Sequence, residues 1–168
     1  MKIFKSFSLI ILFTLSTLTS EAQNKAPNIT YSVEANVSAD KVWEQIRIMD
    51  NIDQVSSYVA TLSWKGPKGV GGERKCVAPD GKGYYVEKIK SFNDNLRTYK
   101  WQVTEGVPAK NVFNSFKVVD MGYNKSMIVF RSNFEFIENP NMTKDQFYGF
   151  LNGAIKEITA SYIELAKK

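Results

Sequence analysis

Apolar and polar residues alternate along several stretches of the chain, and this period of two is typical of β-strands with one buried face. The first stretch is 29–37 and the second is 59–65. Between them the apolar residues change to helical spacing, so we predict two short helices over 39–48 and 50–55. Ser38 precedes the first helix and is a favourable N-cap, because its hydroxyl can accept a hydrogen bond from a free backbone N–H group.

The middle of the chain contains a hairpin signal at Asp80-Gly81, a pair that suits a type I′ turn. Centring the turn there joins strands 73–77 and 84–92 and pairs Arg74 with Glu87. The two charged side chains would then face each other on the same side of the sheet.

Two further hairpins are predicted after this one. A three-residue turn at 93–95 would pair Ile89 with Tyr99, and a second turn would join strands 112–121 and 127–137. In this register one face of the strands collects large apolar side chains and the other face is charged. The apolar face carries Tyr85, Ile89, Tyr99, Trp101, Val103, Phe116, Val118, Ile128, Phe130, Phe134 and Phe136. The charged face carries Lys88, Lys90, Lys100 and Gln102.

A long amphipathic helix is predicted at the C-terminal end. Thr143 and Gln146 form a capping box, in which each side chain satisfies one free backbone donor, and the helix should run to about Lys167. Its apolar stripe consists of Phe147, Phe150, Leu151, Ala154, Ile158, Tyr162 and Leu165. Glycine weakens a helix by about 1 kcal/mol relative to alanine. We therefore expect the sheet, as ordinary close packing, or a ligand to approach the helix closely at Gly149 and Gly153.

Four short motifs stand in a distinctive order along the chain: 38–43 (SADKVW), 69–74 (GVGGER), Asp80-Gly81 and 86–89 (VEKI). Together with the order of the elements, they resemble the START-like superfamily, also called SRPBCC, which includes polyketide cyclase/dehydrase and lipid-transport proteins. The resemblance covers about residues 29–167, but 50–58 lacks the Trp-x-Pro stretch of many relatives, so it identifies no subfamily. It implies an α+β helix-grip fold, in which a curved antiparallel sheet of about seven strands wraps around the last helix and encloses a ligand cavity.

Residues 1–22 have the layout of a secretory signal peptide. Lys2 and Lys5 precede an uncharged apolar core, and small residues up to Ala22 form a cleavage site. Cleavage there would leave 23–168 as a single START-like ligand-binding domain, exported to the periplasm or secreted. The apolar run is short for a bilayer-spanning helix, so an uncleaved membrane anchor is the less favoured alternative.

The amino-acid composition excludes several kinds of chemistry. The chain has no histidine, which rules out Ser-His-Asp and Cys-His nucleophiles and histidine-ligated zinc. Cys76 is the only cysteine, so no disulfide can form within the chain and the fold must depend on its hydrophobic core. We predict no metal, no cofactor and no catalytic residue. The formal net charge of +5 is spread along the chain, which argues against nucleic-acid binding but is compatible with transient contact with an anionic membrane surface.

Arg74 and Glu87 are the most informative charged residues, because an ion pair inside an apolar cavity is costly unless its hydrogen bonds are complete. Three interpretations stay open: a satisfied cross-strand pair, a contact with the polar head group of a ligand, or catalytic acid–base use. Cys76 is interpreted as a small buried side chain. The predicted ligand-binding residues are Arg74, Tyr85, Glu87, Tyr99, Trp101, Phe116, Phe130, Phe134, Phe150 and Ala154.

Residues 66–72 (GPKGVGG) form a loop too rich in glycine for regular structure. The loop matches neither G-x-x-x-x-G-K-[ST] nor G-x-G-x-x-G, and no long helix follows it, so a phosphate site is not predicted. Two interpretations remain: a plain connection between strands, or a lid at the cavity mouth of the kind that similar folds have.

These features favour an exported protein that binds a small apolar or amphipathic ligand, such as a lipid, a sterol or a polyketide-like molecule, between the sheet and the C-terminal helix. Two alternatives stay open. One is a polyketide cyclase-like enzyme that uses carboxylate and tyrosine groups of the cavity. The other is an interaction module whose cavity is filled by its own side chains. A cavity of about 300 Å³ or more would argue against the filled module.

We predict that the exported protein begins near Gln23. The positively charged start, the apolar core and the small residues before Gln23 define the cleavage point. N-terminal sequencing of protein recovered from outside the cytoplasmic membrane measures this directly. An intact Met1 on soluble exported protein would contradict it.

Overall fold

The computed structural model describes residues 26–168, so the predicted signal peptide, residues 1–22, lies outside the described part of the chain. Residues 26–168 contain seven strands and three helices. The strands are β1 (Ile29–Ala35), β2 (Thr61–Lys65), β3 (Glu73–Val77), β4 (Tyr84–Asn93), β5 (Thr98–Glu105), β6 (Ala109–Gly122) and β7 (Lys125–Phe136). The helices are α1 (Ala39–Ile46), α2 (Ile52–Val55) and α3 (Lys144–Ala166). Every element predicted from the sequence is present, with ends that differ by a few residues.

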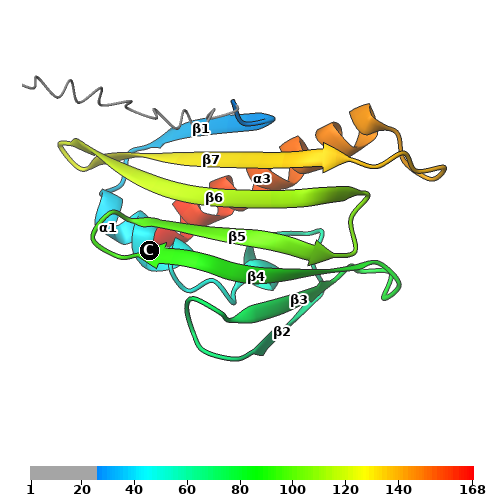
Figure 1. Ribbon diagram of the computed structural model, residues 1–168. Coiled ribbons are helices and arrows are strands. Elements are labelled where there is room, and N and C mark those ends of the chain that lie inside the picture. The colour runs from blue at the N-terminus through cyan, green and yellow to red at the C-terminus, as the bar shows by residue number, and fades with distance from the viewer. Residues whose placement is uncertain (1–25) are drawn as a thin grey trace, which may run out of the picture.

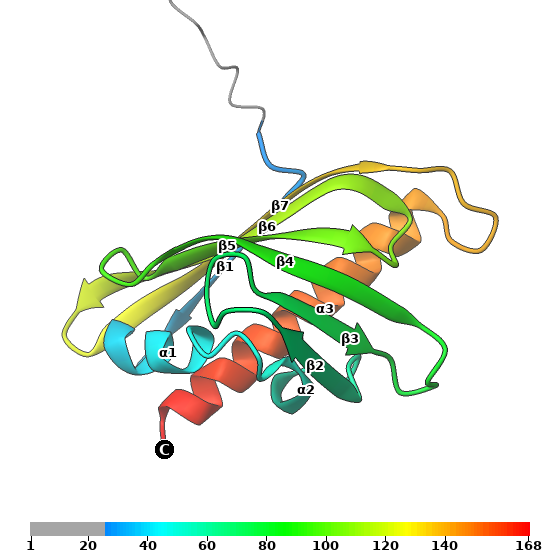
Figure 2. The ribbon, with the colours of Figure 1, turned by 60° about the horizontal axis from the view of Figure 1, so that its bottom comes forward.

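The strands form one antiparallel sheet in the order β1-β7-β6-β5-β4-β3-β2. The sheet is curved, and α3 lies across its concave side (Figure 1). The two short helices, α1 and α2, lie beside the C-terminal half of α3 (Figure 2). This arrangement confirms the predicted α+β helix-grip fold.

Both helix caps predicted from the sequence are confirmed. The Ser38 hydroxyl accepts a hydrogen bond from the backbone N–H of Lys41 at the start of α1. At the start of α3, Thr143 and Gln146 form the complete capping box. These bonds satisfy backbone donors that have no partner within the helix, and they fix where each helix begins.

The buried side of α3 is turned relative to the predicted apolar stripe. Its most buried residues are Phe147, Ile155, Thr159, Tyr162 and Ala166. Thr159 is tolerated there because its hydroxyl donates a hydrogen bond to the carbonyl of Ile155 (2.8 Å). Four residues of the predicted stripe are only half-buried because they line a cavity: Phe150, Leu151, Ala154 and Ile158.

The register predicted for the β3–β4 hairpin is confirmed. Arg74 lies opposite Glu87, and Cys76 lies opposite Tyr85. Arg74, Cys76 and Glu87 are all buried, on the concave side of the sheet. The turn position therefore predicted correctly which charged side chains meet inside the protein.

The turn of this hairpin differs from the predicted type I′ turn. It is a four-residue loop, 79–82, closed by a hydrogen bond from the N–H of Ala78 to the carbonyl of Gly83. Pro79 has no N–H group to donate across the strands, so it cannot take the paired position that a two-residue turn would require. Gly81, at φ 70°, occupies the left-handed position of the loop.

The register predicted between β4 and β5 is wrong by two residues. Ile89 lies opposite Trp101 instead of Tyr99. The loop contains four residues, 94–97, rather than three, and the register shifts again at a bulge around Lys90. Because the error at Ile89 is an even number of residues, Tyr99 and Trp101 still face inward as predicted.

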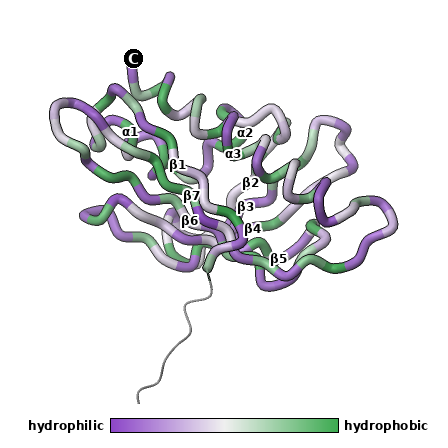
Figure 3. Tube along the Cα trace, turned by 90° about the horizontal axis from the view of Figure 1, so that it is seen from above, coloured by the Kyte–Doolittle hydropathy of each residue, from purple (hydrophilic) through white to green (hydrophobic). Residues whose placement is uncertain are grey.

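A bulge near the start of β6 decides which of its side chains face the concave side. The register with β7 shifts by one residue between Lys110 and Phe113, where Asn111 has a φ of 54°. A shift of one residue exchanges the two faces of a strand. After the bulge, the buried positions are Val112, Asn114, Phe116 and Val118. Figure 3 colours the described residues by hydropathy along the chain.

The two glycines inside α3 have different surroundings. A Cβ atom at Gly149 would meet no atom within 4 Å, so the expectation of a close approach is wrong at this position. A Cβ atom at Gly153 would lie 3.3 Å from the hydroxyl of Tyr58, so a close neighbour is present there.

Replacing Gly149 with alanine is expected to raise the free energy of unfolding by about 0.5–1 kcal/mol, because the exposed position has room for a methyl group and alanine loses less backbone entropy on folding. Urea denaturation followed by circular dichroism measures the change. Gly106→Ala is the matched control and should instead lower the free energy of unfolding. Gly106 has a φ of 85°, and a Cβ atom there would overlap the carbonyl oxygen of Tyr84. Destabilisation by Gly149→Ala would contradict the placement of Gly149 on an open helix face.

Candidate functional site

A cavity lies between the concave side of the sheet and α3. Its inner part has a volume of about 90 Å³ and is lined mainly by apolar side chains of α2, α3 and strands β3 to β7. Arg74 and Glu87 are the only charged residues among those lining it. Pockets that hold drug-sized ligands measure roughly 300–1,000 Å³. The inner part alone can therefore accept only a small group.

A wider vestibule of about 420 Å³ adjoins the inner part. The β3–β4 loop, the β5–β6 loop and the segment before α3 frame it, and none of the residues lining it is charged. Tyr58 and Tyr84 at its edge are 39% and 42% exposed, so the vestibule is open to solvent. The residues that line both spaces are Tyr58, Tyr85, Val107, Phe147 and Phe150. The vestibule therefore leads from solvent to the inner cavity.

Tyr58 stands at the boundary between the two spaces. Its ring packs edge-on against Phe150 of α3, with ring centroids 5.1 Å apart. The preceding residue, Ser57, donates hydrogen bonds from its backbone N–H (2.5 Å) and its hydroxyl (3.0 Å) to the two carboxylate oxygens of Glu157. These contacts attach the segment after α2, which carries Tyr58, to α3.

Eight of the ten residues predicted to bind a ligand line the inner cavity: Arg74, Tyr85, Glu87, Trp101, Phe116, Phe130, Phe150 and Ala154. The other two lie outside both spaces. Tyr99 is fully buried and packs against Trp43 and Trp101, while Phe134 packs against Phe147 near the start of α3. The cavity spans only the middle of the strands, so these two rings contribute to the core instead.

Sequence reasoning missed several lining residues. Ile52, Ser56 and Tyr58 come from the region of α2, where the sequence has no strong pattern. Asn114 was missed because it is polar. The alternation that places Phe116 inward also includes Asn114, and that signal could have identified it.

Arg74 and Glu87 form a buried ion pair with complete hydrogen bonding of the carboxylate. They are 1% and 6% exposed, and Arg74 Nε donates to Glu87 Oε2 (2.5 Å). Trp101 Nε1 donates to the other carboxylate oxygen (2.6 Å), and the guanidinium lies over the Trp101 ring, 5.4 Å from its centroid. Arg74 Nη1 also donates to the backbone carbonyl of Met49. This geometry favours the satisfied cross-strand pair over a head-group contact.

Burial and neighbouring groups shift the pKa values of Arg74, Cys76 and Tyr85. Burial is the largest single influence on the pKa of Arg74 and lowers it, but Glu87 and the neighbouring Tyr99, Cys76 and Tyr162 together outweigh burial, and the pKa lies well above its ordinary value. Burial raises the pKa of the Cys76 thiol to about 12 and the pKa of Tyr85 well above its ordinary range. At neutral pH the thiol and the phenol are therefore protonated. The interpretation of Cys76 as a small buried side chain is confirmed.

The glycine-rich loop, 66–72, lines neither part of the cavity. It joins β2 to β3, at the end of β3 opposite to the loop that frames the vestibule. Its backbone is tied to β4, since Gly71 N–H donates to the Ile89 carbonyl and Ile89 N–H donates to the Gly72 carbonyl. The interpretation as a lid at the cavity mouth is wrong, and the loop is a plain strand connection.

The sequence profile of one protein family, described as polyketide cyclase / dehydrase and lipid transport, matches residues 26–164. This chain belongs to that family. The match covers nearly all of the described residues and confirms the resemblance to the START-like superfamily. A search of curated proteins found no match.

Several solved structures share the fold of this chain. XoxI from Bacillus cereus shares 19% identity, with a TM-score of 0.70 over 81% of this chain and 92% of that protein. Norcoclaurine synthase from Thalictrum flavum, in complex with dopamine and hydroxybenzaldehyde, shares 20% identity, with a TM-score of 0.68 over 82% and 84%. Ara h 8.0201 shares 16% identity, with a TM-score of 0.67 over 82% and 97%. At these identities the likeness establishes the fold alone.

The chemistry available to this family member follows from its own side chains. Glu87 is the only carboxylate among the residues that line the two spaces, and both of its oxygens accept hydrogen bonds. Across residues 26–168, no three Cys, Asp or Glu side chains come close enough together to hold a metal ion. The site can enclose an apolar molecule and offer it a few polar contacts.

Arg74→Met is expected to lower the free energy of unfolding by about 3–5 kcal/mol, because it leaves the buried Glu87 carboxylate without its counter-charge. The double variant Arg74→Met/Glu87→Gln should recover much of this loss, since the introduced amide is neutral and can still accept from Trp101. Urea denaturation measures both. Lys88→Met, on the exposed face of β4, is the matched control and should change stability by less than about 0.5 kcal/mol. A loss of stability for Arg74→Met as small as that expected for Lys88→Met would contradict the buried pairing of Arg74 with Glu87.

Proposed function

We propose that this family member binds a small, mostly apolar molecule between the sheet and α3 and does not transform it. The observation that carries the proposal is the two-part cavity, an apolar space open to solvent whose only charged residues, Arg74 and Glu87, are paired with each other. Burial of apolar surface contributes about 25 cal/mol per Å². Affinity would therefore come mainly from apolar contacts.

The volumes support a ligand that reaches from the vestibule into the inner part. The inner part, about 90 Å³, would accept one end of the molecule, and the vestibule, about 420 Å³, would hold the remainder. A lipid, a sterol or a polyketide-like molecule has this elongated or multi-ring shape. Norcoclaurine synthase, a structural neighbour, has been solved with dopamine and hydroxybenzaldehyde, and its complex supports the use of this fold for small molecules.

The two alternatives have less support. A polyketide cyclase-like enzyme would need a free carboxylate or an easily ionised tyrosine in the cavity, whereas Glu87 is engaged by two donors and burial raises the pKa of Tyr85. An interaction module with a filled cavity would leave no space between sheet and α3. The inner space and the open vestibule argue against it.

Ala154→Leu should weaken binding of 2-naphthol, a fluorescent two-ring probe, by about fivefold or more, because the added carbons occupy the inner cavity and overpacking costs about 1–3 kcal/mol. Fluorescence titration measures the affinity, and thermal denaturation verifies that the variant folds. Ala160→Leu, on the exposed side of the same helix, is the matched control and should bind like the wild type.

Two results would oppose the proposal. One is a wild type that takes up neither 2-naphthol nor a fluorescent fatty acid, and the other is normal binding by Ala154→Leu. Native mass spectrometry of the protein purified from its host adds an independent measurement, since a bound ligand would appear as a mass increment that Ala154→Leu reduces.

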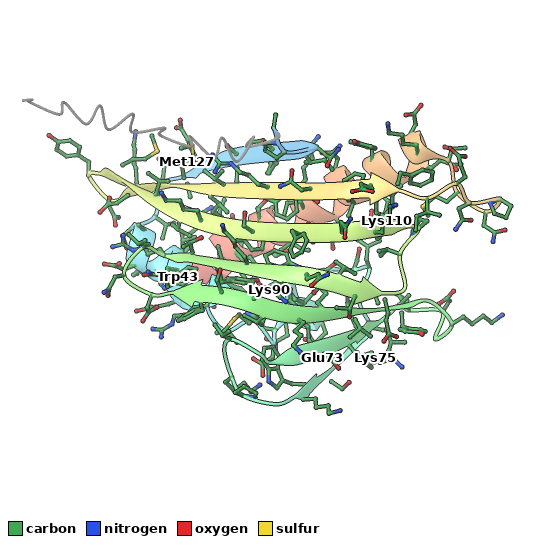
Figure 4. All side chains as sticks on the ribbon, in the orientation of Figure 1. Trp43, Glu73, Lys75, Lys90, Lys110 and Met127 are labelled. Atoms are coloured by element: carbon green, nitrogen blue, oxygen red, sulfur yellow. The ribbon has the colours of Figure 1, made fainter. Side chains whose placement is uncertain are left out.

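We also propose that the protein acts after export and touches anionic membranes transiently. The signal-peptide pattern of residues 1–22 supports export. In the described residues, no helix has the length and apolar character needed to cross a bilayer. Lys90, labelled in Figure 4, lies on the outer face of the sheet. This face is basic, which supports contact with anionic lipids. The exposed cations of this face that form no ion pair within residues 26–168 include Lys75, Lys88, Lys90, Lys100, Lys117 and Arg131.

The mature protein is expected to bind phosphatidylglycerol vesicles at low ionic strength and to dissociate at about 0.5 M salt, where screening removes the attraction. Co-sedimentation measures the bound fraction. Lys100→Glu/Lys117→Glu should reduce it, and Lys41→Glu/Lys156→Glu, a charge-matched control on α1 and α3, should not. Equal binding to phosphatidylcholine vesicles would count against the proposed contact.

A further inference from the structure

Asn114 is a buried polar side chain in the wall of the inner cavity. It is 6% exposed, and its neighbours on the same face of β6, Val112 and Phe116, are each 1% exposed. The bulge between Lys110 and Phe113 gives β6 the register that turns Asn114 inward. The side-chain oxygen of Asn114 makes no hydrogen bond with any residue between 26 and 168.

The polar groups nearest to Asn114 in the sheet do not satisfy it. Trp101 lies directly opposite on β5, but its indole N–H donates to Glu87. Ser132 lies directly opposite on β7, and its hydroxyl also has no partner in the described part of the chain. The two buried groups differ in one respect: Asn114 lines the cavity, whereas Ser132 does not.

A buried amide without a partner lowers the stability of a protein, and such groups are rare in folded structures. An apolar residue at position 114 would fit the surrounding side chains without this cost. Position 114 therefore has a polar side chain that the fold does not need, at a point that a molecule in the cavity can reach.

We propose that Asn114 is the polar recognition residue of the cavity, and that the ligand carries an uncharged hydrogen-bonding group, such as a hydroxyl or a carbonyl, on an apolar body. This inference rests on the proposed binding function. A side-chain amide has an acceptor oxygen and a donor NH₂ group, so it can pair with either kind of ligand group. A charged ligand group would need a buried counter-charge, and Arg74 and Glu87 are already bonded to each other.

The test compares 2-naphthol with 2-methylnaphthalene, in which a methyl group replaces the hydroxyl. Their affinities are measured by fluorescence titration with wild type, Asn114→Leu and the matched control Ser132→Ala. The ratio of the two affinities is compared between proteins, because this cancels the difference in hydration of the two probes. We expect the preference for 2-naphthol to fall by about 3- to 10-fold in Asn114→Leu, the value of one hydrogen bond, and to stay unchanged in Ser132→Ala.

Thermal denaturation of the ligand-free proteins gives a second readout. Asn114→Leu should raise the melting temperature, because it removes a buried amide that has no partner. Asn114→Val, a smaller side chain suited to a strand, provides the same comparison should leucine overpack the site. A lower melting temperature in both variants would mean that the amide has a structural role, and it would overturn the inference.

The binding results separate the inference from the function on which it rests. An unchanged affinity ratio in Asn114→Leu, with 2-methylnaphthalene still bound, would overturn the role of Asn114 and leave the binding function standing. Failure of every protein to bind either probe would overturn both. Tighter wild-type binding of 2-naphthoate, which carries a carboxylate in place of the hydroxyl, would overturn the assignment of an uncharged ligand group.

Discussion

The rest of the structure depends on the burial of one guanidinium group. Arg74 is 1% exposed, and a buried charge is stable only with a counter-charge and complete hydrogen bonds. Glu87 on β4 supplies the charge, Trp101 on β5 occupies the second carboxylate oxygen, and the Met49 carbonyl between α1 and α2 accepts from the guanidinium. One network thus connects three strands to the short helices. It also pairs the two charges of the cavity wall with each other, so that they balance within the lining of the inner cavity.

The cavity exists because α3 does not pack fully against the sheet. Phe147, Ile155 and Tyr162 are buried, while Phe150 and Ala154 line the cavity and are only half-buried. Tyr162 is held by a hydrogen bond from its hydroxyl to Asn51 (3.1 Å), which ties the C-terminal half of α3 to the segment between α1 and α2. The inner cavity and the vestibule lie beside the N-terminal half of α3. The wall of the inner cavity there includes the unpaired amide oxygen of Asn114 on β6. Packing at one end of the helix therefore allows an open site at the other.

Much of the fold follows from local patterns. Ser38 and the Thr143 capping box correctly predicted where two helices begin. The position of Asp80-Gly81 correctly predicted the pairing of Arg74 with Glu87, although the turn does not have the type I′ conformation that was expected. These predictions succeeded because caps and hairpin turns involve residues close together in the sequence. Eight of the ten predicted site residues line the cavity for the same reason, since alternation along a strand determines which side chains face inward.

The sequence by itself determined the class of fold, the faces of most strands and the absence of histidine chemistry, all of which depend on residue type and spacing. The tertiary structure alone decided how far the cavity extends, which excludes Tyr99 and Phe134, and where its entrance lies, at Tyr58 rather than at the glycine-rich loop. It also decided that Asn114 has no partner among the residues described. These properties depend on bulges, on the rotation of α3 and on contacts between side chains far apart in the chain, which no local pattern of apolar and polar residues encodes.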